Sequence, residues 1–554
     1  MRFTPFVPQW AEGAARAGGG GPSVAGLARL GRMPLPRTVR AEWRTVQRVG
    51  RRTEAAPATN WTRLITVLAA LTVLTRLPSF VRTPWNPDEG FLATQARQLA
   101  NGGVLYETVV DRKPPLVPWL YRATFAVFGD DSLWPVRVAA ILAVLVGAVL
   151  VASMAARRWG ERAAWVAGLC YVFLSVGLDP EDTQAATFEV FMLPWTVAAM
   201  WCAERSRWFV AGLAVAGAVL TKQTGGAVLL PVCVVLWQAR AGWTALLGVG
   251  VGTALPILGT AFAFGPGKFL YWIATGSGAY LSADGSGLKP VLRALGALGL
   301  LTLAALPLVV ALVHAVRRRR AGGHPYTATC HGHRVPLGGT ADVWLWLAAS
   351  LAAATVGLQF FGHYFLQLVP SLALLGAAAL HELTARAATA ALTGTALLAC
   401  GYVGWGFTAG RDELDHAHRL ADTVRSYTDR EDRVLLWGMH PEGYWLSRRD
   451  PASRYLTAGF LTNFSGGRGE ARVGERYAME GAWTRFERDL RRRKPELVVD
   501  DSRGKEYGVR RTPTLRRHLG RHYEKVATID GSEFYLRTST GAPHLSRERA
   551  AGPR

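Results

Sequence analysis

Two adjacent acids, Asp88 and Glu89, are followed along the chain by Asp111, Arg112 and Lys113. Long apolar runs flank this stretch, which places it in a loop at a membrane surface. A carboxylate can accept the proton of an attacking hydroxyl, and a fixed cation can stabilise the negative charge of a phosphate. Acids and cations gathered at a bilayer surface therefore suit a phosphate-bearing lipid substrate. The alternative is an ordinary solvated loop, because loops are commonly charged.

Further candidate residues lie near the ends of later apolar runs: Glu189, Lys222 and the pair His363-Tyr364. Glu189 is embedded in an apolar segment, where an ionisable group is costly and usually faces a cavity or a partner. Lys222 suits phosphate binding or simple snorkelling to the interface. A histidine at the end of a span is most often only interfacial, which is the alternative for His363.

The composition is that of a membrane protein. Hydrophobic residues make up 50% of the 554 residues, charged residues 19%, and there are 20 tryptophans, which favour membrane interfaces. The formal net charge of +23 would suggest nucleic acid in a soluble chain. Here much of it lies in short loops between apolar runs, so no nucleic-acid partner is expected. The five cysteines form no C-x-x-C pair, which argues against a disulfide framework or a thiolate metal site.

Eleven apolar runs follow a Gly-, Ala-, Pro- and Arg-rich segment, residues 1–60, which we predict to be a disordered basic cytoplasmic tail. The predicted spans are 62–80, 133–155, 162–178, 185–203, 207–221, 223–239, 242–264, 291–316, 342–360, 363–382 and 386–408. Arginine clusters fall in alternate loops, which marks that side as cytoplasmic. The opposite, outer side receives the 81–132 loop and everything after about residue 409.

Apolar density falls and charge rises in the final segment, 410–554. Residues 433–438 and 496–500 have the pattern of buried strands, and 415–427 and 483–493 that of helices. Strands alternating with helices predict a small α/β domain on the outer side. Acceptor recognition and a structural cap are equally open as its role. The predicted architecture is thus a polytopic α-helical membrane protein, with a catalytic region at 61–409 and a C-terminal extracytoplasmic α/β domain.

The order of these features resembles the GT-C superfamily of integral membrane glycosyltransferases. It is most similar to the bacterial protein-O-mannosyltransferase-like and aminoarabinose-transferase-like enzymes. The signals are Pro87-Asp88-Glu89 and Lys113-Pro114-Pro115-Leu116 at this separation, followed by many spans and the outer His363-Tyr364, over roughly residues 60–410. The resemblance implies a sugar donor on a polyprenyl phosphate and transfer on the extracytoplasmic face.

The resemblance also implies roles for individual residues. Asp88 matches the catalytic aspartate, the alternative being that it only caps the helix that begins near Gly90. Glu89 and Glu189 are its supporting acids, with Glu89 alternatively a solvated first-turn acid. Lys113 lies where relatives place a lysine near the donor phosphate.

Other residues complete the predicted donor-phosphate site: Arg112, Lys222, His363 and Tyr364. Aminoarabinose-transferase relatives carry an acid linked to metal binding immediately before the lysine. Here Arg112 occupies that position and the acid, Asp111, comes one residue earlier. The departure leaves open whether a divalent metal binds, with Asp111 as its candidate ligand.

The leading functional hypothesis is an inverting glycosyltransferase at the plasma membrane. It would move a pentose or hexose, such as arabinose or mannose, from a polyprenyl-phosphate donor to a glycan, lipid or protein acceptor of the cell envelope. The alternatives are a non-catalytic transporter of lipid or sugar-lipid and an envelope scaffold. Transporters often show internal repeats. The sequence has no obvious repeat and its acids gather at one surface, which favours the enzyme.

Overall fold

The computed structural model describes residues 59–276, 285–322, 327–330, 333–336, 340–465, 468–469 and 472–538. The predicted cytoplasmic tail, residues 1–60, lies almost entirely outside them. From Asn60 onward the described residues pack as one compact unit, so the predicted boundary near residue 409 stays a prediction.

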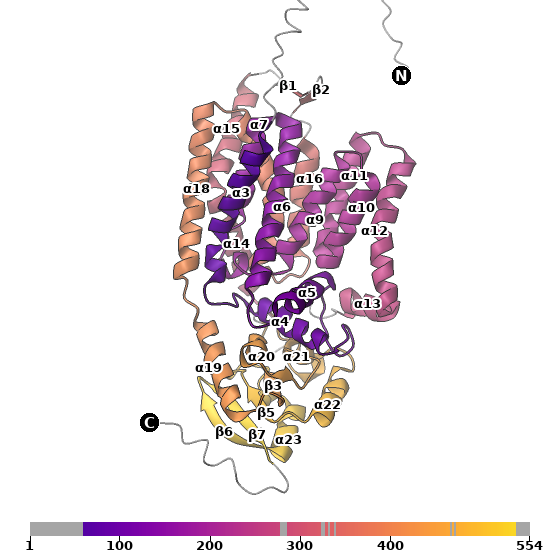
Figure 1. Ribbon diagram of the computed structural model, residues 1–554, viewed down its shortest axis with the longest axis vertical. Coiled ribbons are helices and arrows are strands. Elements are labelled where there is room, and N and C mark those ends of the chain that lie inside the picture. The colour runs from indigo at the N-terminus through magenta and orange to yellow at the C-terminus, as the bar shows by residue number, and fades with distance from the viewer. Residues whose placement is uncertain are drawn as a thin grey trace, which may run out of the picture. The chain divides into compact units, whose positions relative to one another are not determined.

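Helices dominate the first part of this unit (Figure 1). They are α3 Trp61–Arg76, α4 Pro87–Ala100, α5 Leu116–Phe128, α6 Trp134–Trp159, α7 Glu161–Leu174, α8 Pro180–Thr183, α9 Phe188–Ala203, α10 Trp208–Thr221, α11 Leu229–Gln238, α12 Trp243–Phe264, α13 Pro266–Ile273, α14 Lys289–Ala304, α15 Leu306–Gly322, α16 Ala341–Thr355, α17 Val369–His381 and α18 Ala385–Thr408. Short 3-10 segments are η3 Leu77–Phe80, η4 Gln223–Val228 and η7 Gly362–Leu368, and β1 Thr327–Cys330 pairs antiparallel with β2 His333–Pro336.

All eleven predicted spans are largely helical, but fewer meet a strict length requirement for a membrane span. Among the described residues, five helices are long and apolar enough to cross a membrane, and five others are apolar but shorter. The predicted 291–316 span is instead a pair, α14 and α15, bent by 73°. Counting that bent pair as one span gives six. Pro307 in the first turn of α15 suits this break, because proline cannot continue a helix without a clash. The count of eleven stays a prediction.

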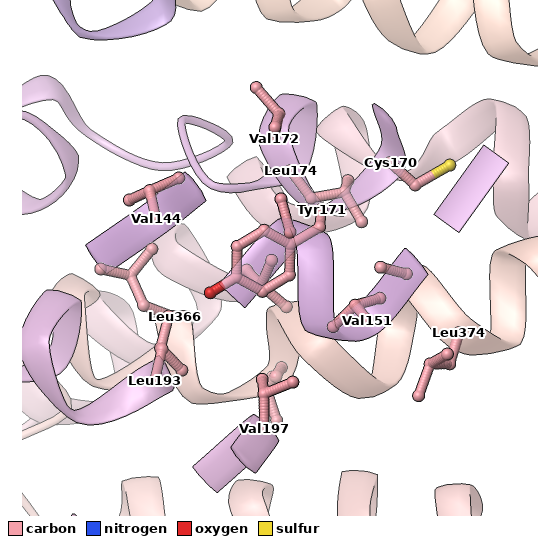
Figure 2. Close-up of a cluster of buried hydrophobic side chains, with 14 of the residues drawn as sticks. Val144, Val151, Cys170, Tyr171, Val172, Leu174, Leu193, Val197, Leu366 and Leu374 are labelled. Atoms are coloured by element: carbon pink, nitrogen blue, oxygen red, sulfur yellow. The ribbon is translucent and has the colours of Figure 1, made fainter. Parts of the chain in front are cut away.

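The centre of the bundle is an apolar core shared by α6, α7, α9 and α17. Figure 2 shows Val144 and Val151 of α6 close to the Tyr171 ring of α7. In this view Leu174 of α7 lies above that ring and Val197 of α9 below it. These side chains are at most 2% exposed, so this face of each helix contacts protein rather than lipid. The core holds the ends of these helices in register, and those ends carry the candidate residues.

The loop predicted at 81–132 contains two helices, α4 and α5. The helix expected at Gly90–Ala100 is present as α4, which begins earlier, at Pro87. The second helix, α5, was not predicted, because its apolar residues were assigned to a loop before the next span. Both helices lie at one end of the bundle, between it and the C-terminal part of the chain (Figure 1).

The C-terminal part is a five-stranded sheet with helices. Its elements are α19 Asp412–Tyr427, β3 Arg433–Trp437, α20 Glu442–Ser447, β4 Asp450–Pro451, α21 Gly459–Thr462, α22 Ala482–Arg493, β5 Leu497–Asp500, α23 Pro513–His522, β6 Tyr523–Ile529 and β7 Ser532–Arg537. The strand order is β4-β3-β5-β7-β6, with β3 parallel to β4 and β5 and the remaining pairs antiparallel. Both predicted strands and both predicted helices are present.

The C-terminal part packs closely against α4. Gly90 faces the first residue of α20, Glu442, so closely that a Cβ on Gly90 would overlap the Glu442 backbone. At the other end of α4, Arg97 donates to the carbonyl oxygen of Tyr444 at 3.4 Å. The helix that carries Asp88 is therefore held between the bundle and the sheet.

Candidate active site

Asp88 lies in the first turn of α4 and is not the cap of that helix. The N-cap is Asn86, whose side-chain oxygen accepts from the backbone N–H of Glu89 at 3.2 Å, and Pro87 occupies the first helical position. Asp88 keeps 46% of its side chain exposed. The positive end of the helix dipole favours the charged carboxylate there. The capping alternative for Asp88 is therefore wrong.

Glu89, the neighbouring acid, points the other way and is completely buried. Its carboxylate forms an ion pair with Arg137 of α6. It also accepts from the backbone N–H groups of Trp85, at 2.7 Å, and Ala186, at 2.6 Å. A buried carboxylate with this many donors is a fixed structural group. It ties the start of α4 to α6 and to the segment before α9, and so positions Asp88.

Asp88 faces His363, at the beginning of η7. The Nε2 atom of His363 lies 3.9 Å from Oδ2 of Asp88, and its Nδ1 lies 2.7 Å from Oδ1 of Asp182. The imidazole stacks on Phe361 with an interplanar angle of 5°. Two carboxylates from separate segments therefore flank one imidazole. Asp182, which no sequence pattern identified as a site residue, is a member of this cluster.

Glu189 and Lys222 form a buried ion pair beside this imidazole. Their side chains are 1% and 4% exposed. The Lys222 ammonium lies 3.8 Å from the ring centroid of Tyr364, a favourable cation–π distance. A buried ion that lost its partner would be strongly destabilising. Glu189 therefore holds Lys222 as a cation beneath Tyr364.

Lys113 approaches the same aromatic group from the loop between α4 and α5. Its Nζ lies 5.3 Å from the ring centroid of Phe188 and 6.0 Å from that of Tyr364. Lys113 and Lys222 are both near enough to Glu189 to interact with it electrostatically. The structure thus brings a second cation to the cluster, and the role predicted for Lys113 at the donor phosphate stays a prediction.

The side chains of Arg112 and Asp111 contact other residues than Lys113 does. The Arg112 guanidinium lies over the ring of Phe460, 4.7 Å from its centroid. Asp111 is 6% exposed and accepts from the Arg112 backbone N–H at 2.6 Å and from Gln95 at 3.4 Å. Burial raises the pKa of Asp111 to about 6.

No group of three His, Cys, Asp or Glu residues that could hold a metal occurs in the part of the chain that the structure describes. The donor set around Asp111 therefore does not fit a metal held by the protein alone. A divalent metal at Asp111 stays a prediction.

Sequence reasoning predicted most of this cluster but missed the residues that orient it. Asp88, Lys113, Glu189, Lys222, His363 and Tyr364 come together. Asp182, Asn86 and Arg137 were not singled out. Asn-Pro before two acids is a helix-start signal that identifies Asn86 as the cap. No local signal connects Asp182 to His363, or Arg137 to Glu89.

Known proteins share parts of this sequence. The family model described as dolichyl-phosphate-mannose-protein mannosyltransferase matches residues 112–272. The undecaprenyl phosphate-alpha-4-amino-4-deoxy-L-arabinose arabinosyl transferase of Erwinia tasmaniensis is 28% identical over 204 residues, which are 33% of this chain and 36% of that protein. The matched segment thus spans about a third of that relative's length.

Two solved structures share the fold over most of the chain. Crystal structures of ArnT from Cupriavidus metallidurans superpose with a TM-score of 0.55 when bound to undecaprenyl phosphate and 0.56 in the apo state. Sequence identities are 18% and 17%. The superpositions cover 88% and 86% of this chain, and 100% and 98% of ArnT.

The chain therefore shares the fold of ArnT over most of its length. Its membership of the GT-C superfamily stays a prediction. With its apolar helices, the chain is a multi-pass membrane protein.

Proposed function

We propose that this chain is an inverting glycosyltransferase that uses a polyprenyl-phosphate-linked sugar. The sugar is a pentose or hexose, such as arabinose or mannose. The acceptor belongs to the cell envelope, and transfer takes place on the outer face of the plasma membrane. The observation that carries the proposal is the half-exposed carboxylate of Asp88 beside His363, with Lys113 and Lys222 both at the ring of the adjacent Tyr364.

Asp88 acts as the general base in this proposal. The acceptor hydroxyl gives its proton to Asp88 while its oxygen attacks the anomeric carbon. The bond from that carbon to the phosphate oxygen breaks on the opposite side, and its electron pair leaves with the phosphate. One displacement of this kind inverts the anomeric configuration. The exposure of Asp88 suits contact with an acceptor arriving from water.

The cations act on the leaving group. A polyprenyl phosphate gains negative charge as the glycosidic bond breaks, and preorganised cations stabilise that charge. Lys113 and Lys222 are held by aromatic rings of Phe188 and Tyr364, so they need no rearrangement when the charge develops. Arg112 takes a smaller part because its guanidinium lies over Phe460.

The named relatives support the choice of donor. One similar structure is described as ArnT bound to undecaprenyl phosphate, and the matching curated protein is described as an undecaprenyl-phosphate arabinosyl transferase. The matching family model is described with a dolichyl-phosphate-linked mannose. All three descriptions name a polyprenyl-type phosphate, and the two that also name a sugar name different ones, 4-amino-4-deoxy-L-arabinose and mannose.

The test is the Asp88→Asn variant. The purified full chain is incubated with a panel of polyprenyl-phosphate sugars and an envelope extract as acceptor, and released polyprenyl phosphate is measured. General-base catalysis contributes on the order of 10²–10⁴-fold, so we expect a loss of that size at normal expression.

Asp412→Asn is the matched control, because Asp412 is an exposed acid in the first turn of α19. It should turn over like wild type. Full turnover by Asp88→Asn would refute the catalytic assignment and favour a transporter.

A further inference from the structure

A cleft of about 630 Å³ lies away from Asp88, where three distant segments of the chain meet. One wall is the loop after α4, with Tyr106 and Glu107, and the second is α13, with Lys268, Tyr271 and Trp272. The third wall comes from the C-terminal part, with Arg454, Glu480 and Arg485. None of these residues belongs to the cluster around Asp88.

Three aromatic residues, Tyr106, Tyr271 and Trp272, line the cleft. Tyr271 and Trp272 are adjacent on α13, with ring centroids 5.4 Å apart at an interplanar angle of 83°. The Trp272 indole N–H donates to the Tyr106 carbonyl oxygen at 3.1 Å, which fixes its ring. Tyr271 is half-buried and keeps part of its ring accessible. Such rings offer an apolar face with a polar edge.

The cations around the cleft already have partners within the protein. Lys268 is paired with Glu107. Arg454 donates two hydrogen bonds of 2.8 Å to the Asp489 carboxylate. Arg485 donates to the Tyr455 hydroxyl at 3.1 Å. An anionic ligand would have to compete with these partners, whereas a neutral ligand rich in hydroxyls can donate to carboxylates and accept from guanidinium groups while they stay in place.

The cleft is connected to the candidate active site by hydrogen bonds. The Tyr106 hydroxyl donates to the carbonyl oxygen of Lys113 at 2.9 Å. Gln223, next to Lys222, donates to the carbonyl oxygens of Arg112 at 2.6 Å and Ile273 at 3.0 Å. The backbone of the proposed donor-phosphate site and the last residue of α13 are therefore fixed to one another.

An aromatic contact makes a second connection. Trp272 in the cleft lies edge-on to Phe460, with centroids 6.3 Å apart. Phe460 also contacts Arg112, and Phe91 of the helix that carries Asp88. An acceptor held against Trp272 would thus be connected through Phe460 to side chains beside the candidate active site.

We propose that this cleft binds a neutral saccharide unit of the acceptor, so that the acceptor is a glycan chain. The inference rests on the proposed function, because it assigns the substrate that receives the sugar. It also decides between the two roles left open for the C-terminal part: Arg454, Glu480 and Arg485 give it a part in acceptor recognition.

The test separates binding from turnover. The full-length Asp88→Asn protein in detergent is mixed with neutral oligosaccharides built from mannose, glucose, galactose or arabinose, and binding is followed by saturation-transfer NMR and titration. At least one oligosaccharide should bind. Tyr271→Ala should weaken that binding about tenfold, as expected for loss of one ring contact together with its hydroxyl.

Glu480→Gln is the second variant, because Glu480 is exposed and its replacement carries little risk to folding. It should also weaken binding. The matched control is Tyr427→Ala, a half-buried tyrosine at the end of α19 and outside the cleft, which should bind like the parent protein.

Three outcomes would overturn the inference: no oligosaccharide binds, Tyr271→Ala and Glu480→Gln both bind normally, or inorganic phosphate displaces the saccharide by occupying the cleft. Failure of the proposed function has a different signature. Wild-type protein would then release no polyprenyl phosphate from any donor, whether or not oligosaccharides bind.

Discussion

Asp182 and His363 lie 181 positions apart in the sequence, and their side chains are joined by a hydrogen bond of 2.7 Å between Oδ1 and Nδ1. Gly362 makes this approach possible, because a Cβ at that position would overlap the Asp182 carboxylate. With Nδ1 donating to Asp182, the other ring nitrogen is directed toward Asp88. Asp182 therefore positions the imidazole.

We expect Asp182→Asn to lower transfer by roughly 10- to 100-fold, the equivalent of losing one hydrogen bond to a charged group. The measurements are kcat, KM for the donor and the unfolding temperature in detergent. The value of kcat should fall while the unfolding temperature stays close to that of wild type, whereas a purely structural role would lower the unfolding temperature as well. Asp179→Asn is the control, because Asp179 caps α8 by accepting from Glu181 and asparagine caps equally well.

Lys113→Ala should impair donor use, and Arg112→Ala should have a smaller effect. The Lys113 ammonium lies between the rings of Phe188 and Tyr364 beside the cluster, whereas the Arg112 guanidinium lies over Phe460. The measurement is kcat and KM for the polyprenyl-phosphate sugar. Unchanged values for Lys113→Ala would remove Lys113 from the donor-phosphate site.

Gly90→Val should destabilise the protein. Its side chain would overlap the backbone of Glu442, where the neighbours are fixed, and overpacking of this kind typically costs about 1–3 kcal/mol. Thermal unfolding in detergent measures the effect. Ala100→Val, at the exposed end of the same helix, is the control for β-branching and should leave the unfolding temperature nearly unchanged. Equal stability of the two variants would mean that α20 does not pack on Gly90.

Asp111→Asn should stabilise the protein at neutral pH. Burial raises the pKa of Asp111 from 3.8 to about 6, so the folded state binds the proton more tightly than the unfolded state does. This group's contribution to stability is therefore greatest below about pH 4 and falls as the pH rises to about 6. At pH 7.5 the buried carboxylate opposes folding, by about 3 kcal/mol at most.

Asparagine has no charge to bury. If its amide nitrogen takes the place of Oδ2, turning the Gln95 amide over brings Oε1, which has no hydrogen-bond partner, to accept from it. The unfolding temperatures of wild type and Asp111→Asn are compared at pH 5 and pH 7.5. The gain should be larger at the higher pH. An equal gain in unfolding temperature at both pH values, or a lower unfolding temperature at pH 7.5, would contradict the raised pKa of Asp111.

The predicted orientation places the C-terminal part outside the cell. Ser426 of α19 and Ala239 at the end of α11 are both exposed and lie on sides predicted to be opposite. In a background lacking Cys170, Cys202, Cys233, Cys330 and Cys400, a membrane-impermeant maleimide on intact cells should label Ser426→Cys and not Ala239→Cys. Labelling of Ala239→Cys and not of Ser426→Cys would show that the orientation is the opposite of the predicted one.

The sequence by itself determined the elements and most of the candidate site. Long apolar runs specify helices because the backbone must satisfy its own hydrogen bonds in lipid, and the bounds of α6, α9 and α12 follow their runs closely. The acids and cations at the ends of those runs, such as Asp88, Lys113 and Lys222, were identifiable from the sequence. An ionisable side chain next to a membrane-spanning run costs free energy, and such residues are usually functional.

Only the tertiary structure decided which of these groups act together. Asp88 and Glu89 are neighbours in the sequence, but they point in different directions, one half-exposed and one buried against Arg137. Successive residues of a helix are about 100° apart around its axis, so packing determines which of them is buried. Asp182 reaches His363 only because the helices between them fold back into one bundle. Contacts between segments so distant leave no local pattern in the sequence.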